Sequence, residues 1–344
     1  MRRVCVAITA RPSYSRVQTV LEALRDRSDV ELQIVACASA LMTRYGRVAD
    51  QIEADGFEIT DRLPSVIEDD TVANSARSTG LLLTQMAGTL ERLRPDVVVT
   101  IADRHETLAT AIAASYQHIP LAHIQGGEIS GSIDNKVRWA VTQLADLHLV
   151  ATERAAERLR VLYKTSPIIV TGCPGIDLAR RAKELGPIHR ADVVVLQHPV
   201  TDQADQAGEQ MRATIDAIGR DALYFWPGED AGGAAMSKEL RLAGIQPVRS
   251  LPPLEFLRVL LGAKLLVGNS SVGIRECSYL GVPVANIGDR QRHRERASNV
   301  LDLQPPFSHS GFVSRPKPST LYGDGHAGER IAAILAGKAE EVAA

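Results

Sequence analysis

Short aliphatic runs alternate with helical patterns along most of the chain, and this alternation constrains the fold more than any other feature. Six short, largely apolar runs in the first half have the character of strands buried on both faces: residues 4–8, 32–37, 97–100, 121–124, 147–151 and 168–170. Apolar residues at helical spacing lie between them, as in Val17, Val20, Leu21 and Leu24. Strands joined by crossover helices form βαβ units, so the pattern predicts a doubly wound parallel sheet.

The same rhythm restarts after a Gly/Pro-rich segment at residues 171–175. We expect strands at 193–196, 223–226, 265–267 and 284–287, and helices at 202–218, 253–261 and 271–280. A Gly/Pro-rich segment between two such patterns is typical of a domain boundary. The fold class predicted is therefore α/β, with two Rossmann-like doubly wound domains facing a cleft and a first domain spanning residues 1–170.

Composition excludes several functional classes. The 344 residues carry 39 Lys+Arg against 41 Asp+Glu, without the basic excess of a general nucleic-acid binder. No apolar run approaches the roughly 18–20 residues of a membrane span. The four cysteines are widely separated and the nine histidines are scattered, so we predict reduced thiols, no metal site and a cytoplasmic location.

In a doubly wound sheet, ligands bind beyond the carboxyl ends of the strands, so polar residues at those positions are the first candidates for function. Arg11, Ser15 and Arg16 follow the first strand, where the two arginines could face an anion at a helix N-terminus; a solvated first turn is the alternative. Asp103 follows the strand at 97–100, where partial desolvation would raise its pKa and suit it to proton transfer. Alternatively, Asp103 caps the helix that begins near Glu106.

Residues 123–138 form the third polar segment. Two glycines between Gln125 and Glu128 allow the backbone to approach a ligand closely. Asp134 and Arg138 are four residues apart on one predicted helix face, where they either serve a ligand or form a simple surface ion pair.

The fourth segment follows the strand at 265–267 and has the small hydroxyl residues of a diphosphate cradle. Ser270, Ser271 and Gly273 stand at a strand-to-helix turn, and Glu276 is placed to accept from ribose hydroxyls. Helix capping by serine is the competing explanation.

Two further strands are followed by polar residues. His198 follows the strand at 193–196 and either contacts a phosphate or is structural. Arg290 opens a basic run, residues 290–296, which we expect to be mostly solvated helix surface with one arginine reaching the cleft.

Taken together, these strings resemble the hydrolysing UDP-N-acetylglucosamine 2-epimerases. The resemblance is carried by His-Ile-Gln-Gly-Gly-Glu at 123–128, with Asp134 and Arg138, and by residues 197–201, 268–276, 290–291 and 322–325. It is strongest to the sialic-acid-pathway branch and to the epimerase half of the bifunctional animal enzyme.

The resemblance implies a GT-B-like pair of domains, with 171–325 binding the nucleotide and a final helix within 326–344 returning to the first domain. It also implies a homodimer or homotetramer, no cofactor, and a UDP-sugar substrate. Members eliminate UDP, add water to C1 and reprotonate C2 on the opposite face, giving N-acetylmannosamine. By position, Asp103 and Asp134 would be the acid/base residues, and Arg104 and Arg138 would line the sugar pocket. The remaining roles fall on the leaving nucleotide: Arg11, Ser15, His198, Ser270, Ser271 and Arg290 on the diphosphate side, and Glu276 on the ribose.

One departure from the family pattern bears directly on the chemistry. The family's glutamate at the third position of the 123–128 string is Gln125 here, and an amide cannot exchange a proton at C2. Three hypotheses follow. The first is a 2-epimerase whose acid/base work is redistributed among Asp103, Asp134 and His105 or Glu128. The second is a nucleotide-sugar hydrolase that does not invert C2 or acts on another sugar. The third is a GT-B glycosyltransferase or a silent nucleotide-sugar-binding protein.

Overall fold

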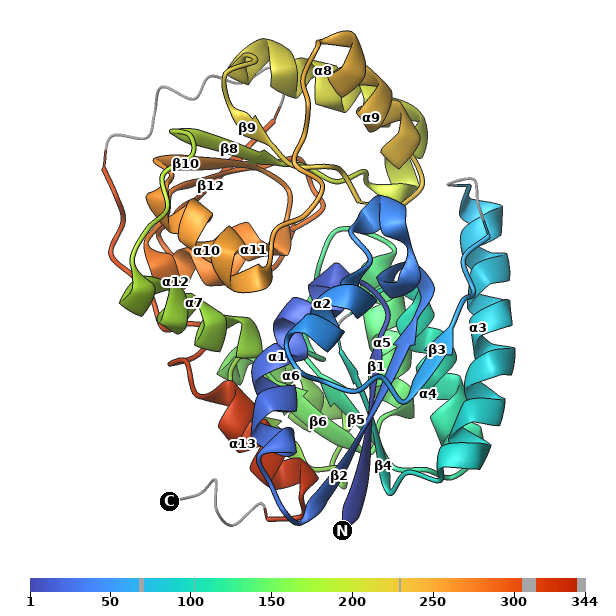
Figure 1. Ribbon diagram of the computed structural model, residues 1–344. Helices are drawn as coiled ribbons and strands as arrows, with labels where there is room; N and C mark the ends of the chain where they lie inside the picture. The colour runs from blue at the N-terminus through green and yellow to red at the C-terminus, as the bar shows by residue number, and fades with distance from the viewer. Residues whose placement is uncertain (68–70, 102, 229, 305–313, 339–344) are drawn as a thin grey trace.

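The computed structural model describes residues 1–67, 71–101, 103–228, 230–304 and 314–338, and it contains two parallel sheets (Figure 1). The first has the order β3-β2-β1-β4-β5-β6-β7. Its strands are β1 (Arg2–Ile8), β2 (Val30–Cys37), β3 (Asp61–Leu63), β4 (Val97–Ile101), β5 (Leu121–Ile124), β6 (Leu147–Val150) and β7 (Ile168–Val170). The second has the order β12-β11-β10-β8-β9. Its strands are β8 (Val193–Leu196), β9 (Leu223–Tyr224), β10 (Leu265–Gly268), β11 (Val284–Ile287) and β12 (Val300–Leu303).

Helices connect the strands of each sheet, as the alternating pattern predicts. The first sheet carries α1 (Arg11–Arg25), α2 (Val48–Ala54), α3 (Val72–Leu93), α4 (His105–Tyr116), α5 (Asp134–Leu144) and α6 (Glu153–Leu162). The second carries α7 (Pro174–Leu185), α8 (Ala207–Ile218), α9 (Gly233–Leu242), α10 (Pro253–Gly262), α11 (Ser271–Ile274) and α12 (Glu276–Leu280). Short 3-10 turns are η1 (Ala38–Leu41), η2 (Thr43–Tyr45) and η3 (Thr201–Gln206). The predicted fold class is confirmed: two doubly wound α/β domains face each other.

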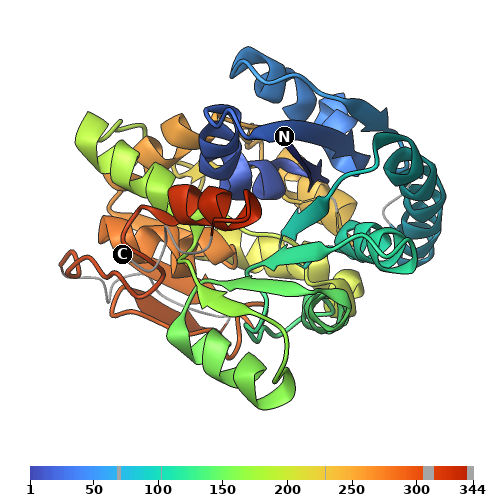
Figure 2. The same ribbon diagram turned by 90° about the horizontal axis from the view of Figure 1, so that it is seen from below.

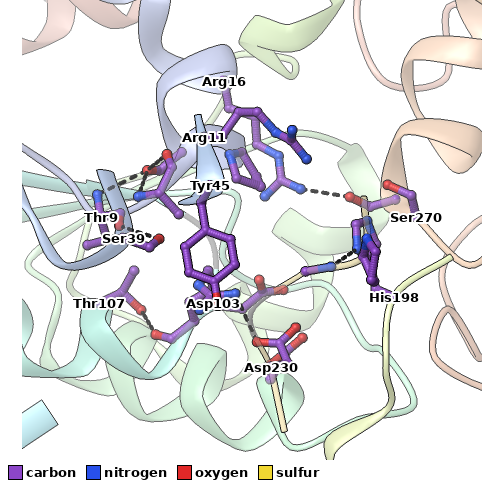
Figure 3. Close-up of a pocket in the computed structure, with 18 of the residues that line it drawn as sticks. Thr9, Arg11, Arg16, Ser39, Tyr45, Asp103, Thr107, His198, Asp230 and Ser270 are labelled. Carbon is purple, nitrogen blue, oxygen red and sulfur yellow. Dashed lines mark hydrogen bonds and ion pairs between the residues drawn. The ribbon is translucent and has the colours of Figure 1, made fainter. Parts of the chain in front are cut away.

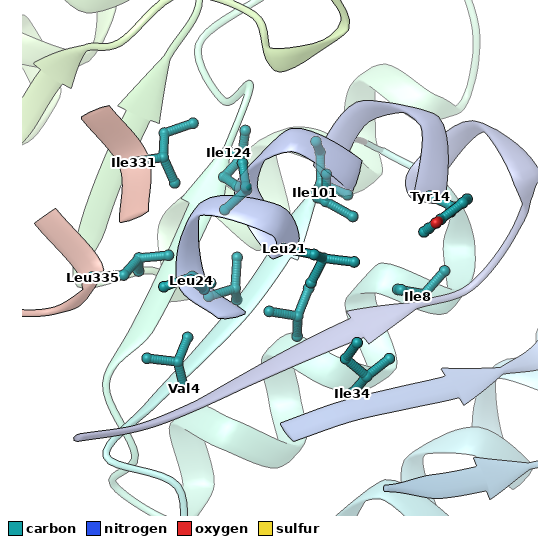
Figure 4. Close-up of a cluster of buried hydrophobic side chains, with 14 of the residues drawn as sticks. Val4, Ile8, Tyr14, Leu21, Leu24, Ile34, Ile101, Ile124, Ile331 and Leu335 are labelled. Atoms are coloured by element: carbon teal, nitrogen blue, oxygen red, sulfur yellow. The ribbon is translucent and has the colours of Figure 1, made fainter. Parts of the chain in front are cut away.

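Helix α13 (Ala327–Leu335) follows the second sheet in sequence but packs on the first domain (Figure 2). Ile331 and Leu335 join the buried cluster formed by β1 and the apolar face of α1, including Leu24 (Figure 4). Residues 339–344, the end of the segment predicted as a terminal helix, lie outside the described residues. Division of the chain at residues 170 and 325 stays a prediction.

The chain therefore passes between the domains twice, and the two passages touch. The amide of Cys173 donates to the carbonyl of Tyr322 at 2.8 Å. Gly172 and Gly323 both have positive φ, 84° and 126°. A Cβ on either glycine would lie 3.2 Å from the Cα of the other, so only glycine fits this contact without displacement.

The structure differs from the sequence-based expectation at several elements. The edge strands β3 and β12 were not predicted, because short, partly polar segments give little periodic signal. The helix expected at 202–218 begins as η3, with non-helical geometry at Gln203, and β9 ends two residues early. The helix expected at 271–280 is divided at Arg275, which has φ −97° and ψ −74°. Among the described helices, none is long and apolar enough to cross a membrane.

Candidate active site

Two adjoining cavities lie between the domains, at the carboxyl ends of strands from both sheets. Figure 3 shows the first of them. They enclose about 900 and 750 Å³, part of it open to solvent. Both are lined by the start of α1 and by the turn before α11, so we treat them as one cleft; the shared residues are Arg11, Pro12, Arg16, His198, Ser270 and Ser271.

The cleft brings together most of the residues singled out in the sequence. Ten line it: Arg11, Ser15, Asp103, Arg104, Asp134, His198, Ser270, Ser271, Glu276 and Arg290. Four others do not appear in its lining: Gln125, Glu128, Arg138 and Gly273. Gly273 packs against the strands below, where an added Cβ would lie 2.8 Å from the side chain of Val284.

The pKa of Asp103 is shifted in the direction opposite to the one predicted from the sequence. Burial by itself would raise the pKa of this carboxyl, as predicted from its place after a strand. Three buried arginines outweigh that effect and hold the pKa well below its usual range: Arg138, Arg294 and Arg16. The predicted upward shift of this pKa is therefore wrong, and the resting Asp103 carboxyl is ionised at neutral pH. Nor does it cap α4, whose N-cap residue is Arg104.

Asp134 has the raised pKa that was expected for Asp103. Burial and the negative charge of Asp103 raise the pKa of Asp134 to about 6, although Arg290 lies 3.5 Å from its carboxylate. Arg138 does not satisfy Asp134, since its guanidinium turns to Asp103 instead. The surface ion pair considered for positions 134 and 138 is therefore not what these side chains form. The cleft thus holds two carboxylates whose pKa values are pushed in opposite directions.

Glu128 lies behind the cleft wall, where it is 4% exposed. Arg275 donates to its carboxylate at 2.7 Å, and Arg294 contacts the same oxygen. Burial opposes ionisation, but these two arginines lower the pKa of Glu128 to about 2. The run 290–296 is therefore not a solvated helix: it forms turns, and Arg294 is buried within the ion-pair cluster.

Gln125 is also enclosed rather than exposed to the cleft. It is 1% exposed, has a positive φ of 66°, and donates from Nε2 to Sγ of Cys173 at 2.8 Å. Its side-chain amide oxygen, Oε1, has no hydrogen-bond partner among the described residues.

The opposite side of the cleft is suited to an anion. Arg16 donates to Oγ of Ser271 at 2.7 Å and so brings a cation from α1 to the turn before α11. Ser270 makes no side-chain capping bond, which leaves capping unsupported as its role. His198 accepts at Nδ1 from the amide of Gly228 at 3.0 Å, which places its proton on Nε2. Burial, with the charge of Arg290, lowers the pKa of His198 to about 3, so it is a neutral donor.

The second cavity combines apolar walls with one carboxylate. Leu178, Phe225, Phe256 and Val272 are among its lining residues, and Glu276 stands beside them. An added Cβ at Gly175 would lie 2.3 Å from Oε1 of Glu276, so this glycine permits the close approach. Burial raises the pKa of Glu276 despite nearby arginines.

Several site residues were not identified from the sequence. Asp230 accepts from Arg104 at 2.9 Å and lies 3.8 Å from Arg290, linking the two domains across the cleft. The signal available was its position shortly after β9. Tyr45 and Trp226 also line the first cavity. Within the described residues, no group of His, Cys, Asp and Glu side chains is arranged to hold a metal ion.

If the cleft binds UDP, as the resemblance implies, Arg11→Ala is expected to weaken that binding by about tenfold, because it removes a cation from the part of the cleft shared by both cavities. Titration calorimetry with UDP measures the effect, and Arg27→Ala, at an ion pair outside the cleft with Asp29, is the control. An unchanged dissociation constant would contradict the placement of the anion here.

The fold and site define a two-domain α/β enzyme with a cationic, carboxylate-bearing cleft, and comparison with known proteins specifies the family. Residues 22–336 match the family model for UDP-N-acetylglucosamine 2-epimerase. A UDP-N,N'-diacetylbacillosamine 2-epimerase (hydrolyzing) from Legionella pneumophila is 30% identical over 361 residues, covering 97% of this chain and 96% of that protein. A UDP-N-acetylglucosamine 2-epimerase from Neisseria meningitidis is 27% identical, covering 88% and 83%.

Among solved structures, the UDP-GlcNAc 2-epimerase of Methanocaldococcus jannaschii, in complex with UDP-GlcNAc and UDP, superposes with a TM-score of 0.77. The identity is 18%, and the match covers 97% of this chain and 99% of that one. The chain belongs to the UDP-N-acetylglucosamine 2-epimerase family, and it is an enzyme of that family.

Proposed function

We propose that this enzyme is a hydrolysing 2-epimerase that converts UDP-N-acetylglucosamine, or a related UDP-N-acetylhexosamine, to the 2-epimeric free sugar and UDP. The observation that carries the proposal is the pair of cleft carboxylates with opposed pKa shifts, Asp103 and Asp134. Inversion at C2 requires one group that accepts a proton and another that donates one, and such a pair supplies both.

The first step is elimination. The bond between C1 and the diphosphate oxygen breaks, and its electron pair leaves with UDP. Arg11, Ser271 and the Nε2 proton of neutral His198 are placed to stabilise that charge. The positive charge that develops at C1 acidifies the adjacent C2–H bond, so even a weakly basic carboxylate such as Asp103 suffices to take this proton. Because its pKa is low, Asp103 then releases the proton to solvent. The product is an unsaturated sugar with a C1–C2 double bond.

The second step adds water. Oxygen from water bonds to C1 while C2 takes a proton on the opposite face. With a pKa near 6, Asp134 holds a proton in part of its population near neutrality and regains it from the added water. His105 and Glu128, considered as alternatives, are less suited: neither lines the cleft, and Glu128 is committed to two arginines.

The alternative is a nucleotide-sugar hydrolase that releases UDP without inverting C2, and Gln125 was its main support. Because Gln125 does not line the cleft, Gln125→Glu is expected to leave the ratio of 2-epimer to unchanged sugar the same within about twofold. Product analysis by NMR measures the ratio. A sharp rise in the 2-epimer would instead favour a diverged hydrolase.

Proton NMR of UDP-N-acetylglucosamine incubated with the enzyme in deuterated water tests the function itself. We expect free UDP and N-acetylmannosamine carrying deuterium at C2. Release of N-acetylglucosamine that keeps its C2 proton would contradict epimerisation. Absence of reaction would contradict this substrate, and the diacetylated sugar nucleotide named for the Legionella relative would be tried next.

We extend the proposal to the setting of the enzyme. Free UDP and a UDP-sugar are its ligands, and it requires no cofactor. We propose that it acts as a homodimer or homotetramer in the cytoplasm, on the sialic-acid-type branch of the family.

A further inference from the structure

Arg294 belongs to the C-terminal domain but contacts two buried carboxylates of the N-terminal domain. Its guanidinium donates from Nη1 to Glu128 and from Nη2 to Oδ2 of Asp103, the latter at 3.2 Å. The side chain is 4% exposed and does not appear in the cleft lining, whereas Asp103 does. Arg294 therefore contacts Asp103 from behind, on the side away from a bound substrate.

We propose that Arg294 is a positioning residue through which the C-terminal domain holds the Asp103 carboxylate in its working orientation. The inference rests on the proposed function, in which Asp103 accepts the C2 proton. It adds that this acceptor is completed only when the two domains are together.

The geometry of the contacts supports this role. Arg138 and Arg294 both contact Oδ2 of Asp103, so the carboxylate is fixed at one oxygen and Oδ1 remains to act on a substrate. The other terminal nitrogen of the Arg294 guanidinium, Nη1, donates to Oε2 of Glu128. Nη2 of Arg275 donates to the same oxygen at 2.7 Å. A planar guanidinium that is bound to two fixed carboxylates has little freedom to move.

The two arginines reach Asp103 from opposite domains. Arg138 lies on α5 of the same domain as Asp103, while Arg294 follows β11 of the other domain. Two more charged groups act on this carboxylate, the cation of Arg16 on α1 and the anion of Asp134 on α5. Separation of the domains would remove the Arg294 contact and leave the contact from Arg138 in place.

Arg294→Gln is the main test, in the full-length enzyme with UDP-N-acetylglucosamine. We expect kcat to fall about 100-fold, since a small misplacement of a reacting group has that effect. The primary isotope effect on kcat with substrate deuterated at C2 should rise, because removal of the C2 proton by a misplaced Asp103 carboxylate becomes rate-limiting. The dissociation constant of UDP should stay within about twofold.

Arg294→Lys separates charge from geometry. Lysine keeps the cation but cannot bind both carboxylates through a planar guanidinium, so kcat should stay about tenfold low and the isotope effect should lie between those of wild type and Arg294→Gln. Arg292→Gln is the matched control: it removes an exposed arginine two positions earlier and should change neither quantity.

An Arg294→Gln enzyme with an unchanged C2 isotope effect, or with UDP binding lost in parallel with kcat, would show that Arg294 only supports its loop. Wild-type kcat in Arg294→Lys would also overturn the inference, and this test holds even if the glutamine variant does not fold. Failure of the proposed function is distinguishable, because wild-type enzyme would then place no deuterium at C2.

Discussion

Asp134→Asn is expected to reduce kcat by about 1,000-fold while leaving the dissociation constant of UDP within a few-fold. Asparagine keeps the size of the side chain and can still face Arg290, but it has no proton to exchange. Stopped-time NMR assays of C2 deuteration measure the rate, and calorimetry measures UDP binding.

The pH profile gives the same prediction a second readout. Asp134 must be protonated to donate, so C2 deuteration should decline as pH rises through its pKa, at about 6 or above because a bound diphosphate raises it further. This limb should be absent from the residual activity of Asp134→Asn. Asp289→Asn, which alters an exposed carboxylate beside Arg290, is the control. Full activity in Asp134→Asn would remove Asp134 from the mechanism.

Glu128→Gln is expected to lower the free energy of unfolding by about 3–5 kcal/mol, because Arg275 and Arg294 would be left as buried charges without their shared anion. Urea denaturation followed by circular dichroism measures the loss. Glu153→Gln breaks an exposed pair with Arg160 and should change stability by less than about 0.5 kcal/mol. Equal effects of the two variants would contradict the description of the buried cluster.

The lowered pKa of Glu128 also predicts that the stability of the folded protein falls in acid. The pKa of Glu128 is lowered from 4.5 to about 2 on folding, so its contribution is complete above 4.5 and is lost as pH falls toward 2. Wild-type stability should therefore decline across this interval, and the decline should be shallower in Glu128→Gln. A parallel decline in both proteins would assign the acid sensitivity to other groups.

The sequence was sufficient to predict the fold because the central strands of both sheets are short, largely apolar runs between helical patterns. Asp103, Asp134 and His198 could likewise be placed at strand ends, where a doubly wound sheet gathers its ligands. Cross-domain partners could not be predicted in this way. Part of the lowering of the Asp103 pKa comes from Arg294, which is 191 positions away in the chain.

Gln125 illustrates the same limit in a single residue. Its place within the motif at 123–128 indicated a side chain facing the sugar. A left-handed backbone conformation instead directs it to Cys173, and no periodicity in the sequence reports that turn.

We expect the paired passages at Gly172 and Gly323 to restrict how the two domains can move relative to each other. Two domains joined by a single connection can twist freely about it. Two adjacent, hydrogen-bonded connections, as in this chain, act together as one hinge. Motion of the two domains is then a rotation about this one hinge, so they separate and close again in the same relative orientation. We expect each closure to return Arg294 to the same carboxylate, without a search over orientations.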